Sequence, residues 1–187
     1  KTVEIKDVGK HLGEEIKLRG WIRNYPKGSS KLRFLVFRDG TGEIQAVAFK
    51  PEMGEENFEE TKKITIESSV ELIGIPNKHP KRENEFEFQL KKLNIINIAA
   101  EYPISKKEHG PDFLLSHRHL WIRSRKQNAI LKIRHTVYFA ISDYLNRNGF
   151  YRFDSPILTP NACEGTTTLF QVPYFDEGNA YLSQSGQ

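Results

Sequence analysis

The chain has 187 residues, of which 37% are hydrophobic and 28% charged; this is enough for one large or two small folded domains and excludes wholesale disorder. Lysine and arginine number 28 against 24 acidic residues, a mildly basic balance that permits a nucleic-acid partner without requiring one. The single cysteine, Cys163, excludes an internal disulfide and favours a reducing cytoplasm, and no stretch approaches the roughly 18 apolar residues that a membrane helix needs.

The first hundred residues show the alternation of apolar and polar side chains that is typical of strands with one buried face. Ile16, Leu18 and Ile22 alternate with charged or polar neighbours, and turns rich in glycine or proline at 26–30 and 38–42 separate the first three strands. The predicted strands are, in chain order, 16–23, 32–37, 44–49, 69–75 and 86–98.

Between the third and fourth strands, residues 51–64 are acidic and begin with a proline, which predicts a short helix. Three strands, a helix and two strands in about 85 residues match the layout of an OB-fold, a five-stranded barrel whose strand face and loops bind oligonucleotides. A small β-barrel without a ligand fits the pattern equally well, because a fold does not determine a function.

The segment 101–118 is predicted to be a linker between two domains. Prolines and a glycine interrupt it, and its charged residues are too polar to be buried. The chain therefore divides into a barrel at residues 1–100 and a second domain at residues 119–187.

The second domain begins with the strongest helical pattern of the chain, at residues 127–148. Its apolar residues recur every three or four positions and form a wide stripe that must pack on something. A strand is predicted directly after it, at 150–158, where Pro156 confines the strand to an edge or an interface because proline donates no ladder hydrogen bond. Two more short strands are predicted at 168–172 and 180–183.

The barrel carries side chains that suit single-stranded nucleic acid. Phe34, in the second strand, can stack on an unpaired base, and Gln45, in the third, offers a donor and an acceptor to a base edge. A core position for Phe34 and a solvated one for Gln45 fit the pattern as well. The basic residues around the first two strands, which can hold phosphates, are Arg19, Arg23, Lys27, Lys31 and Arg33.

The second domain resembles the class II aminoacyl-tRNA synthetases. Residues 148–158 read NGFYRFDSPIL, a helix end, a glycine–aromatic break and a segment with a proline. This resembles motif 1 of the family, and the resemblance implies a homodimer with Phe150 and Pro156 at its interface. Residues 160–170, PNACEGTTTLF, and 181–187, YLSQSGQ, resemble the aspartyl, asparaginyl and lysyl subgroup, called class IIb.

In that subgroup a Glu-Gly loop closes over the amino acid, and a Ser-x-Gln strand lines its pocket. The resemblance implies that Glu164 binds the ammonium group of the substrate, with Gly165 making its loop mobile. An ammonium group needs an anionic partner in a desolvated pocket, and loop closure would strengthen the pair by excluding water. Ser185 and Gln187 are then the neutral hydrogen-bond partners of the amino acid.

An OB-fold ahead of motif 1 is the arrangement of this subgroup, so the resemblance covers nearly the whole chain. It implies an anticodon-binding barrel followed by the start of an antiparallel α/β catalytic domain, an α+β architecture. In the aspartyl and asparaginyl enzymes the aromatic residue matching Phe34 stacks on the middle anticodon base, a uridine, and the glutamine matching Gln45 hydrogen-bonds that base. Arg23 and Lys27 are expected to belong to the same anticodon-binding surface.

The loop sequence resembles the archaeal-type asparaginyl enzymes, because aspartyl enzymes usually carry an acidic residue near Thr168 and a proline at the position of Gly186. The resemblance implies an asparagine–tRNA ligase that uses asparagine, ATP with Mg²⁺, and tRNA(Asn). An aspartate–tRNA ligase, charging tRNA(Asp) or both tRNAs, and a non-catalytic tRNA-binding OB-fold protein are the alternatives.

The family's motifs 2 and 3 hold the arginines for ATP and the acidic ligands of Mg²⁺, and neither motif is found in the chain. The catalytic residues are therefore unassigned, and no metal ligand is expected among these residues. A chain that ends at Gln187 is expected to be inactive by itself.

Overall fold

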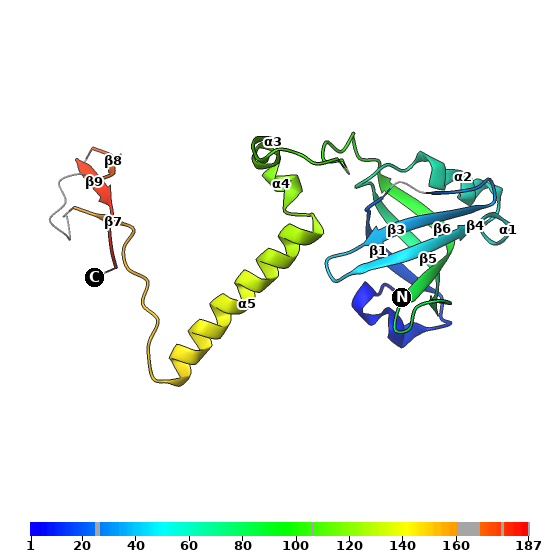
Figure 1. Ribbon diagram of the computed structural model, residues 1–187, viewed down its shortest axis with the longest axis horizontal. Coiled ribbons are helices and arrows are strands. Elements are labelled where there is room, and N and C mark those ends of the chain that lie inside the picture. Colours follow the sequence, from blue (N-terminus) through cyan, green and yellow to red (C-terminus); the bar gives the residue numbers. More distant parts are fainter. Residues whose placement is uncertain (25–26, 106, 161–168, 177, 187) are drawn as a thin grey trace. The chain divides into compact units, whose positions relative to one another are not determined.

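The computed structural model describes residues 1–24, 27–105, 107–160, 169–176 and 178–186 (Figure 1). The chain forms two compact units, Lys1–Gly110 and Pro111–Gln187. Among the described residues, no helix combines the length and the apolar character needed to cross a membrane.

The first unit is a closed β-barrel, and it confirms the predicted five-stranded OB-fold (Figure 1). Its strands are β1 Ile16–Ile22, β2 Lys27–Gly28, β3 Leu32–Arg38, β4 Glu43–Phe49, β5 Ser69–Lys78 and β6 Phe86–Asn97. Their order is β1-β5-β6-β4-β3-β2, and a further pairing of β1 with β3 closes the barrel. The pairing of β4 with β6 is parallel, while the others in this sheet are antiparallel. The two-residue strand β2 lies where only a turn was predicted.

Three short helices accompany the barrel: the 3-10 helix η1 Ile5–His11, α1 Lys50–Met53 and α2 Glu55–Lys63. The last two replace the single helix predicted at 51–64. Gly54 separates them, because its φ of 78° is incompatible with a continuous right-handed helix.

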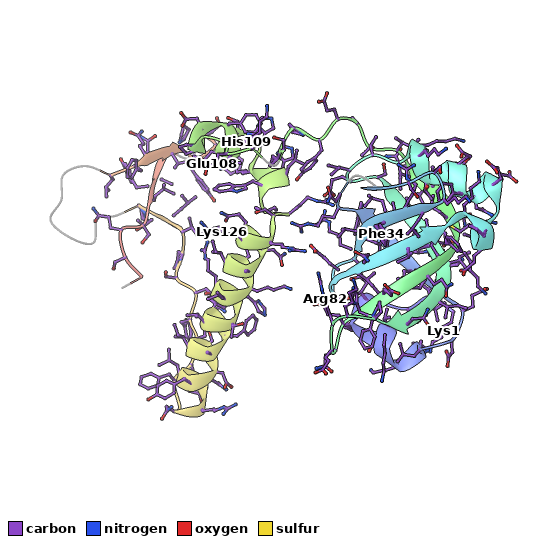
Figure 2. All side chains as sticks on the ribbon, turned by 45° about the vertical axis from the view of Figure 1, so that its right-hand side comes forward. Lys1, Phe34, Arg82, Glu108, His109 and Lys126 are labelled. Atoms are coloured by element: carbon purple, nitrogen blue, oxygen red, sulfur yellow. The ribbon has the colours of Figure 1, made fainter. Side chains whose placement is uncertain are left out.

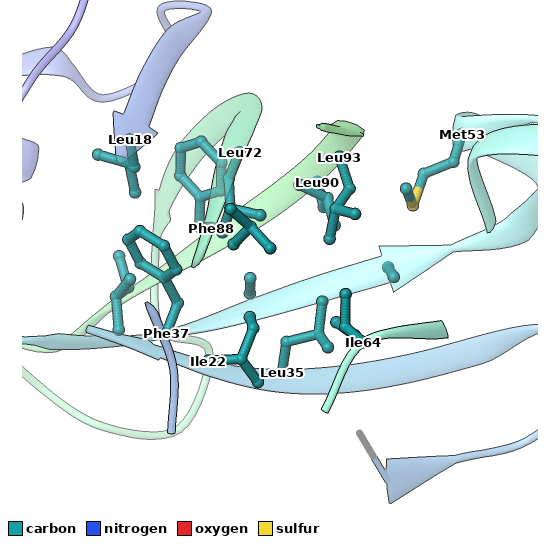
Figure 3. Close-up of a cluster of buried hydrophobic side chains, with 14 of the residues drawn as sticks. Leu18, Ile22, Leu35, Phe37, Met53, Ile64, Leu72, Phe88, Leu90 and Leu93 are labelled. Atoms are coloured by element: carbon teal, nitrogen blue, oxygen red, sulfur yellow. The ribbon is translucent and has the colours of Figure 1, made fainter. Parts of the chain in front are cut away.

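The core of the barrel combines alternate strand residues that point inward with apolar residues of the short helices, such as Met53 and Phe58 (Figure 3). The largest fully buried side chains include Phe37, Phe58, Phe88, Ile16, Leu18, Ile22, Leu35, Leu72 and Leu90. Because successive side chains of a strand point to opposite faces, the residues between these positions lie on the outside of the barrel.

Gly20 and Gly74 permit close approach of neighbouring strands. A Cβ atom on Gly20 would lie 2.1 Å from the carbonyl oxygen of Arg38 on β3, and one on Gly74 would lie 2.1 Å from that of Gln89 on β6. Non-bonded heavy atoms are optimally separated by about 3.5 to 4.0 Å, so neither position accepts a side chain without backbone movement. Gly20 is thus required by the β1–β3 pairing that closes the barrel.

The turn between β3 and β4 is tied to η1 by one carboxylate. Asp39 accepts hydrogen bonds from the backbone N–H groups of Ile5 at 2.7 Å, Thr41 at 2.6 Å and Gly42 at 3.0 Å. It also accepts one from the hydroxyl of Thr41 at 2.7 Å. Asp39 therefore holds the N-terminal helix against the barrel, in addition to the buried contacts of Val8.

The second unit contains α3 Pro111–Ser116, α4 Arg118–Trp121, α5 Arg125–Arg147, β7 Leu158–Thr159, β8 Gln171–Pro173 and β9 Asn179–Leu182. The long helix predicted at 127–148 is confirmed as α5. Ser124 caps its start by accepting a hydrogen bond from the Gln127 backbone N–H at 3.4 Å, and Gly149, with φ of 86°, follows its end. Helix α3 occupies part of the segment that was predicted to be a linker.

The strand predicted at 150–158 is wrong over most of its length. Only Leu158, with Thr159, enters a strand, in a three-stranded sheet of order β7-β9-β8. The preceding residues have no ladder partner in the described part of the chain, and Tyr151 and Phe153 are 91% and 94% exposed. A segment becomes a strand only where its backbone groups can bond a neighbouring strand. The strand predicted at 180–183 is found as β9.

Candidate nucleic-acid interface and amino-acid site

Phe34 is 38% exposed on the outside of the barrel, next to the buried Leu35 of β3 (Figure 2). In the antiparallel register it pairs with Val47 of β4, and Val36 pairs with Gln45. Gln45 is half-buried and on the same outer face, diagonal to Phe34 across the two strands. The structure therefore brings the two predicted base-binding residues together on one surface.

The same surface continues across β6 and β5, which the sequence analysis missed. The parallel pairing places Glu87 beside Gln45, and the antiparallel pairing places Asn77 beside Glu87. Gln89 likewise lies beside Val47. These residues form a row of carboxylate and amide groups next to Phe34. Their alternation with buried residues predicts that these side chains point outward. Only the strand register shows which residues lie beside them on the neighbouring strands.

The predicted phosphate-binding residues occupy different environments. Arg23 forms an ion pair with Glu43 of β4. Lys27 lies in β2, where it pairs in register with Phe34, and the position of its side chain is outside the described part. Lys31 is exposed at the turn before β3. Arg23 and Lys27 thus belong to strands or turns that border the Phe34 surface.

Arg19 forms its ion pair across β1 and β5, away from Phe34. Its Nε donates to Glu71 of β5 at 2.9 Å, Lys17 Nζ lies 2.9 Å from the other carboxylate oxygen, and Asn94 donates to that oxygen at 3.1 Å. The hydrogen bonds from Lys17 and Arg19 lower the pKa of Glu71 from 4.5 to about 2. Arg19 is therefore a partner of Glu71 on the β1–β5 side rather than a member of the Phe34 surface.

The second unit carries part of the predicted amino-acid site. Ser185 is half-buried, and its carbonyl oxygen accepts a hydrogen bond from the Ser183 hydroxyl at 2.5 Å. The Ser183 backbone N–H donates to the carbonyl of Ile157 at 2.9 Å, so the end of β9 runs beside the segment that contains Pro156. Glu164 and Gln187, the other two predicted contacts, lie outside the described residues.

The apolar stripe of α5 is exposed. No residue of this helix is buried within the described part of the chain, and Ile133, Ile141 and Tyr144 are each more than half exposed. Phe150 and Pro156, predicted at a dimer interface, are exposed as well. A contiguous exposed apolar surface on a folded protein marks a site that other protein segments or subunits contact.

Among the described residues, no three histidine, cysteine, aspartate or glutamate side chains cluster around one point. No catalytic step through Mg²⁺ is therefore assigned to them.

Two family comparisons cover most of the chain. Residues 16–96 match the OB-fold nucleic acid binding domain, and residues 110–187 match the tRNA synthetases class II (D, K and N). The chain combines an OB-fold nucleic acid binding domain with part of a class II tRNA synthetase (D, K and N) domain. The expected fold class is confirmed with it: an OB-fold barrel followed by the start of a class II synthetase domain.

Curated relatives of this chain include the asparagine–tRNA ligases of Sorangium cellulosum and Desulforamulus reducens. They are 47% identical over 187 residues and 51% identical over 183 residues, which cover 100% and 98% of this chain. The asparaginyl-tRNA synthetase of Pyrococcus horikoshii, solved with asparaginyl-adenylate, superimposes with a TM-score of 0.89 at 38% identity, over 100% of this chain and 43% of that one. The chain spans 42% of the length of both curated relatives.

Proposed function

We propose that the chain is part of an asparagine–tRNA ligase, comprising the anticodon-binding barrel and the beginning of the catalytic domain. The observation that carries this proposal is the 47% to 51% identity to asparagine–tRNA ligases, which extends over both units. The complete enzyme would activate asparagine with ATP and transfer the acyl group to tRNA(Asn) in the cytoplasm. ATP and Mg²⁺ would bind through residues other than those described.

The barrel would bind the anticodon on the outer face of β3 and β4. Phe34 is exposed enough to stack on an unpaired base, and Gln45 offers an amide donor and acceptor beside it. Arg23 and Lys27 would contribute positive charge toward the RNA backbone at the border of this surface. The ion pair with Glu43 offsets part of the charge of Arg23.

The amino-acid site would be assembled around the end of β9. Glu164 would pair with the ammonium group of asparagine, and Ser185 and Gln187 would supply neutral hydrogen bonds. Neutral partners suit an amide side chain, whereas the carboxylate of aspartate would require a cation. The hydrogen bond from Ser183 to the Ser185 carbonyl supports this role, because it fixes the backbone next to the proposed contacts.

The exposed face of α5 would be covered by a second copy of the enzyme. The face is apolar along most of the helix, and Phe150 and Pro156 continue the exposed surface beyond its end. Burial of such side chains in a homodimer would remove them from water. Light scattering on the complete enzyme tests this: Ile141→Asp is expected to shift the dimer toward monomer, whereas Ile96→Asp on the barrel is not.

The substrate assignment is tested by two measurements. In the complete enzyme, ATP–pyrophosphate exchange is expected with asparagine and not with aspartate, and Glu164→Ala is expected to reduce it sharply. Exchange that runs equally well with aspartate would replace the asparagine assignment with the aspartate one. Charging of tRNA(Asn), with anticodon GUU, but not of tRNA(Asp), with GUC, separates a discriminating enzyme from a non-discriminating one.

A further inference from the structure

Three side chains from separate elements form a hydrogen-bonded chain beside the proposed anticodon surface. Gln89 of β6 donates through its Nε2 to the carboxylate of Glu52 in α1. Asn77 of β5 donates through its Nδ2 to the Oε1 of Gln89 at 3.2 Å. Glu52 is exposed, while the two amides are half-buried. These two hydrogen bonds therefore link Glu52, in a helix beside the barrel, to Asn77 on the outer face of the barrel.

The carboxylate of Glu52 determines how the amide groups of Gln89 and Asn77 are oriented. An ionised carboxylate accepts hydrogen bonds and donates none, so Gln89 must turn its NH₂ group toward Glu52. The carbonyl oxygen of Gln89 then faces Asn77, which must turn its own NH₂ group toward it. Asn77 is left with its carbonyl oxygen Oδ1, for which no hydrogen bond is found among the described residues.

Asn77 belongs to the surface that carries Gln45. It pairs with Glu87, and Glu87 pairs with Gln45, so the three lie in one row across β5, β6 and β4. Strands are spaced by about 4.8 Å, which separates Asn77 from Gln45 by roughly 10 Å. The two amides are therefore too far apart to contact the same hydrogen-bonding edge of one base.

We infer that Glu52 is a positioning residue for RNA recognition: it orients the amide of Asn77, through Gln89, so that this part of the surface accepts hydrogen bonds. The ligand it selects is an unpaired base with N–H donors on its exposed edge, next to the base that stacks on Phe34. The inference deepens the proposed function and rests on it. Glu52 itself does not contact the RNA.

Reversal of the charge at position 52 tests this directly. In Glu52→Lys, the ammonium group donates to the Gln89 carbonyl, Gln89 donates to the Asn77 carbonyl, and Asn77 then presents its NH₂ group. Binding of the 187-residue chain is measured against GUU anticodon stem-loops in which each anticodon base in turn is replaced by the other three. At one position next to the middle base, the preference is expected to change from donor-bearing to acceptor-bearing bases, by about five- to tenfold.

Two further variants complete the series. Glu52→Gln, which can accept or donate, is expected to weaken the preference without reversing it. Glu56→Lys is the matched control. Glu56 is an exposed residue of α2, so its replacement changes the charge by the same amount without touching the hydrogen bonds between Glu52, Gln89 and Asn77. Glu56→Lys is expected to change affinity for all stem-loops alike.

The orientation can also be followed without RNA. The side-chain NH₂ resonances of Gln89 and Asn77 are expected to shift in Glu52→Ala and to stay unchanged in Glu56→Ala. Unchanged resonances, or a base preference of Glu52→Lys identical to that of Glu56→Lys, would overturn the inference. Phe34→Ala distinguishes this from failure of the proposed function: if Phe34→Ala also leaves binding unchanged, the surface is not the RNA site at all.

Discussion

Replacement of Phe34 by alanine is the sharpest test of the barrel surface. The side chain is 38% exposed on the outer face of β3, so its removal leaves the core residues Leu35 and Phe37 in place. Stacking of one base on an aromatic ring contributes about 1 to 3 kcal/mol, which corresponds to a dissociation constant about 5- to 150-fold higher for Phe34→Ala. Fluorescence anisotropy with a labelled GUU stem-loop, at one fixed salt concentration, measures this change.

Two further substitutions show whether stacking is the cause. Phe34→Tyr keeps the ring and is expected to retain affinity, whereas Phe34→Leu keeps an apolar side chain and is expected to lose most of it. Ile96→Ala is the control, since Ile96 is a 63% exposed apolar residue of β6 far along the strand from Gln89. Equal affinities of Phe34→Ala and Ile96→Ala would refute the reasoning, as would loss of binding in Phe34→Tyr.

The remaining predictions concern the stability of the barrel, measured by urea unfolding. The folded pKa of Glu71, about 2, lies below its ordinary value of 4.5, so its stabilisation is complete above that value and is lost as the pH falls toward 2. The difference in urea midpoint between the wild type and Glu71→Gln is therefore expected to be largest above pH 5 and to shrink on acidification; a constant difference would contradict this. Asp39→Ala is expected to destabilise by about 2 to 3 kcal/mol, because three backbone N–H groups lose a charged acceptor, and Asp39→Asn by less. Gly20→Ala is expected to cost about 3 kcal/mol, because its Cβ would meet the Arg38 carbonyl; a variant as stable as the wild type would show that β1 and β3 can separate.

The sequence by itself determined the elements whose pattern is local. Alternation located the barrel strands, the three-to-four-residue period located α5, and the order of strands and helix indicated the OB-fold. Phe34 and Gln45 could also be singled out, since their chemistry suits a base and they stand on neighbouring strands. The motif sequences indicated the synthetase family, which the comparisons confirm.

Prediction from the local sequence pattern failed where a strand needs a neighbouring strand or where a single residue interrupts a helix. The strand predicted directly after α5 fails over residues 150–157, which have no ladder partner among the described residues. The helix predicted at 51–64 is divided at Gly54, where a positive φ interrupts it.

Only the tertiary structure decided which residues share a surface. The parallel register of β4 and β6 brings Glu87 beside Gln45, although more than forty residues separate them in the chain, and it makes the hydrogen-bonded chain from Glu52 part of the same face. The physical reason is that side-chain direction follows from the local backbone, whereas strand register follows from how the whole barrel packs its core and closes.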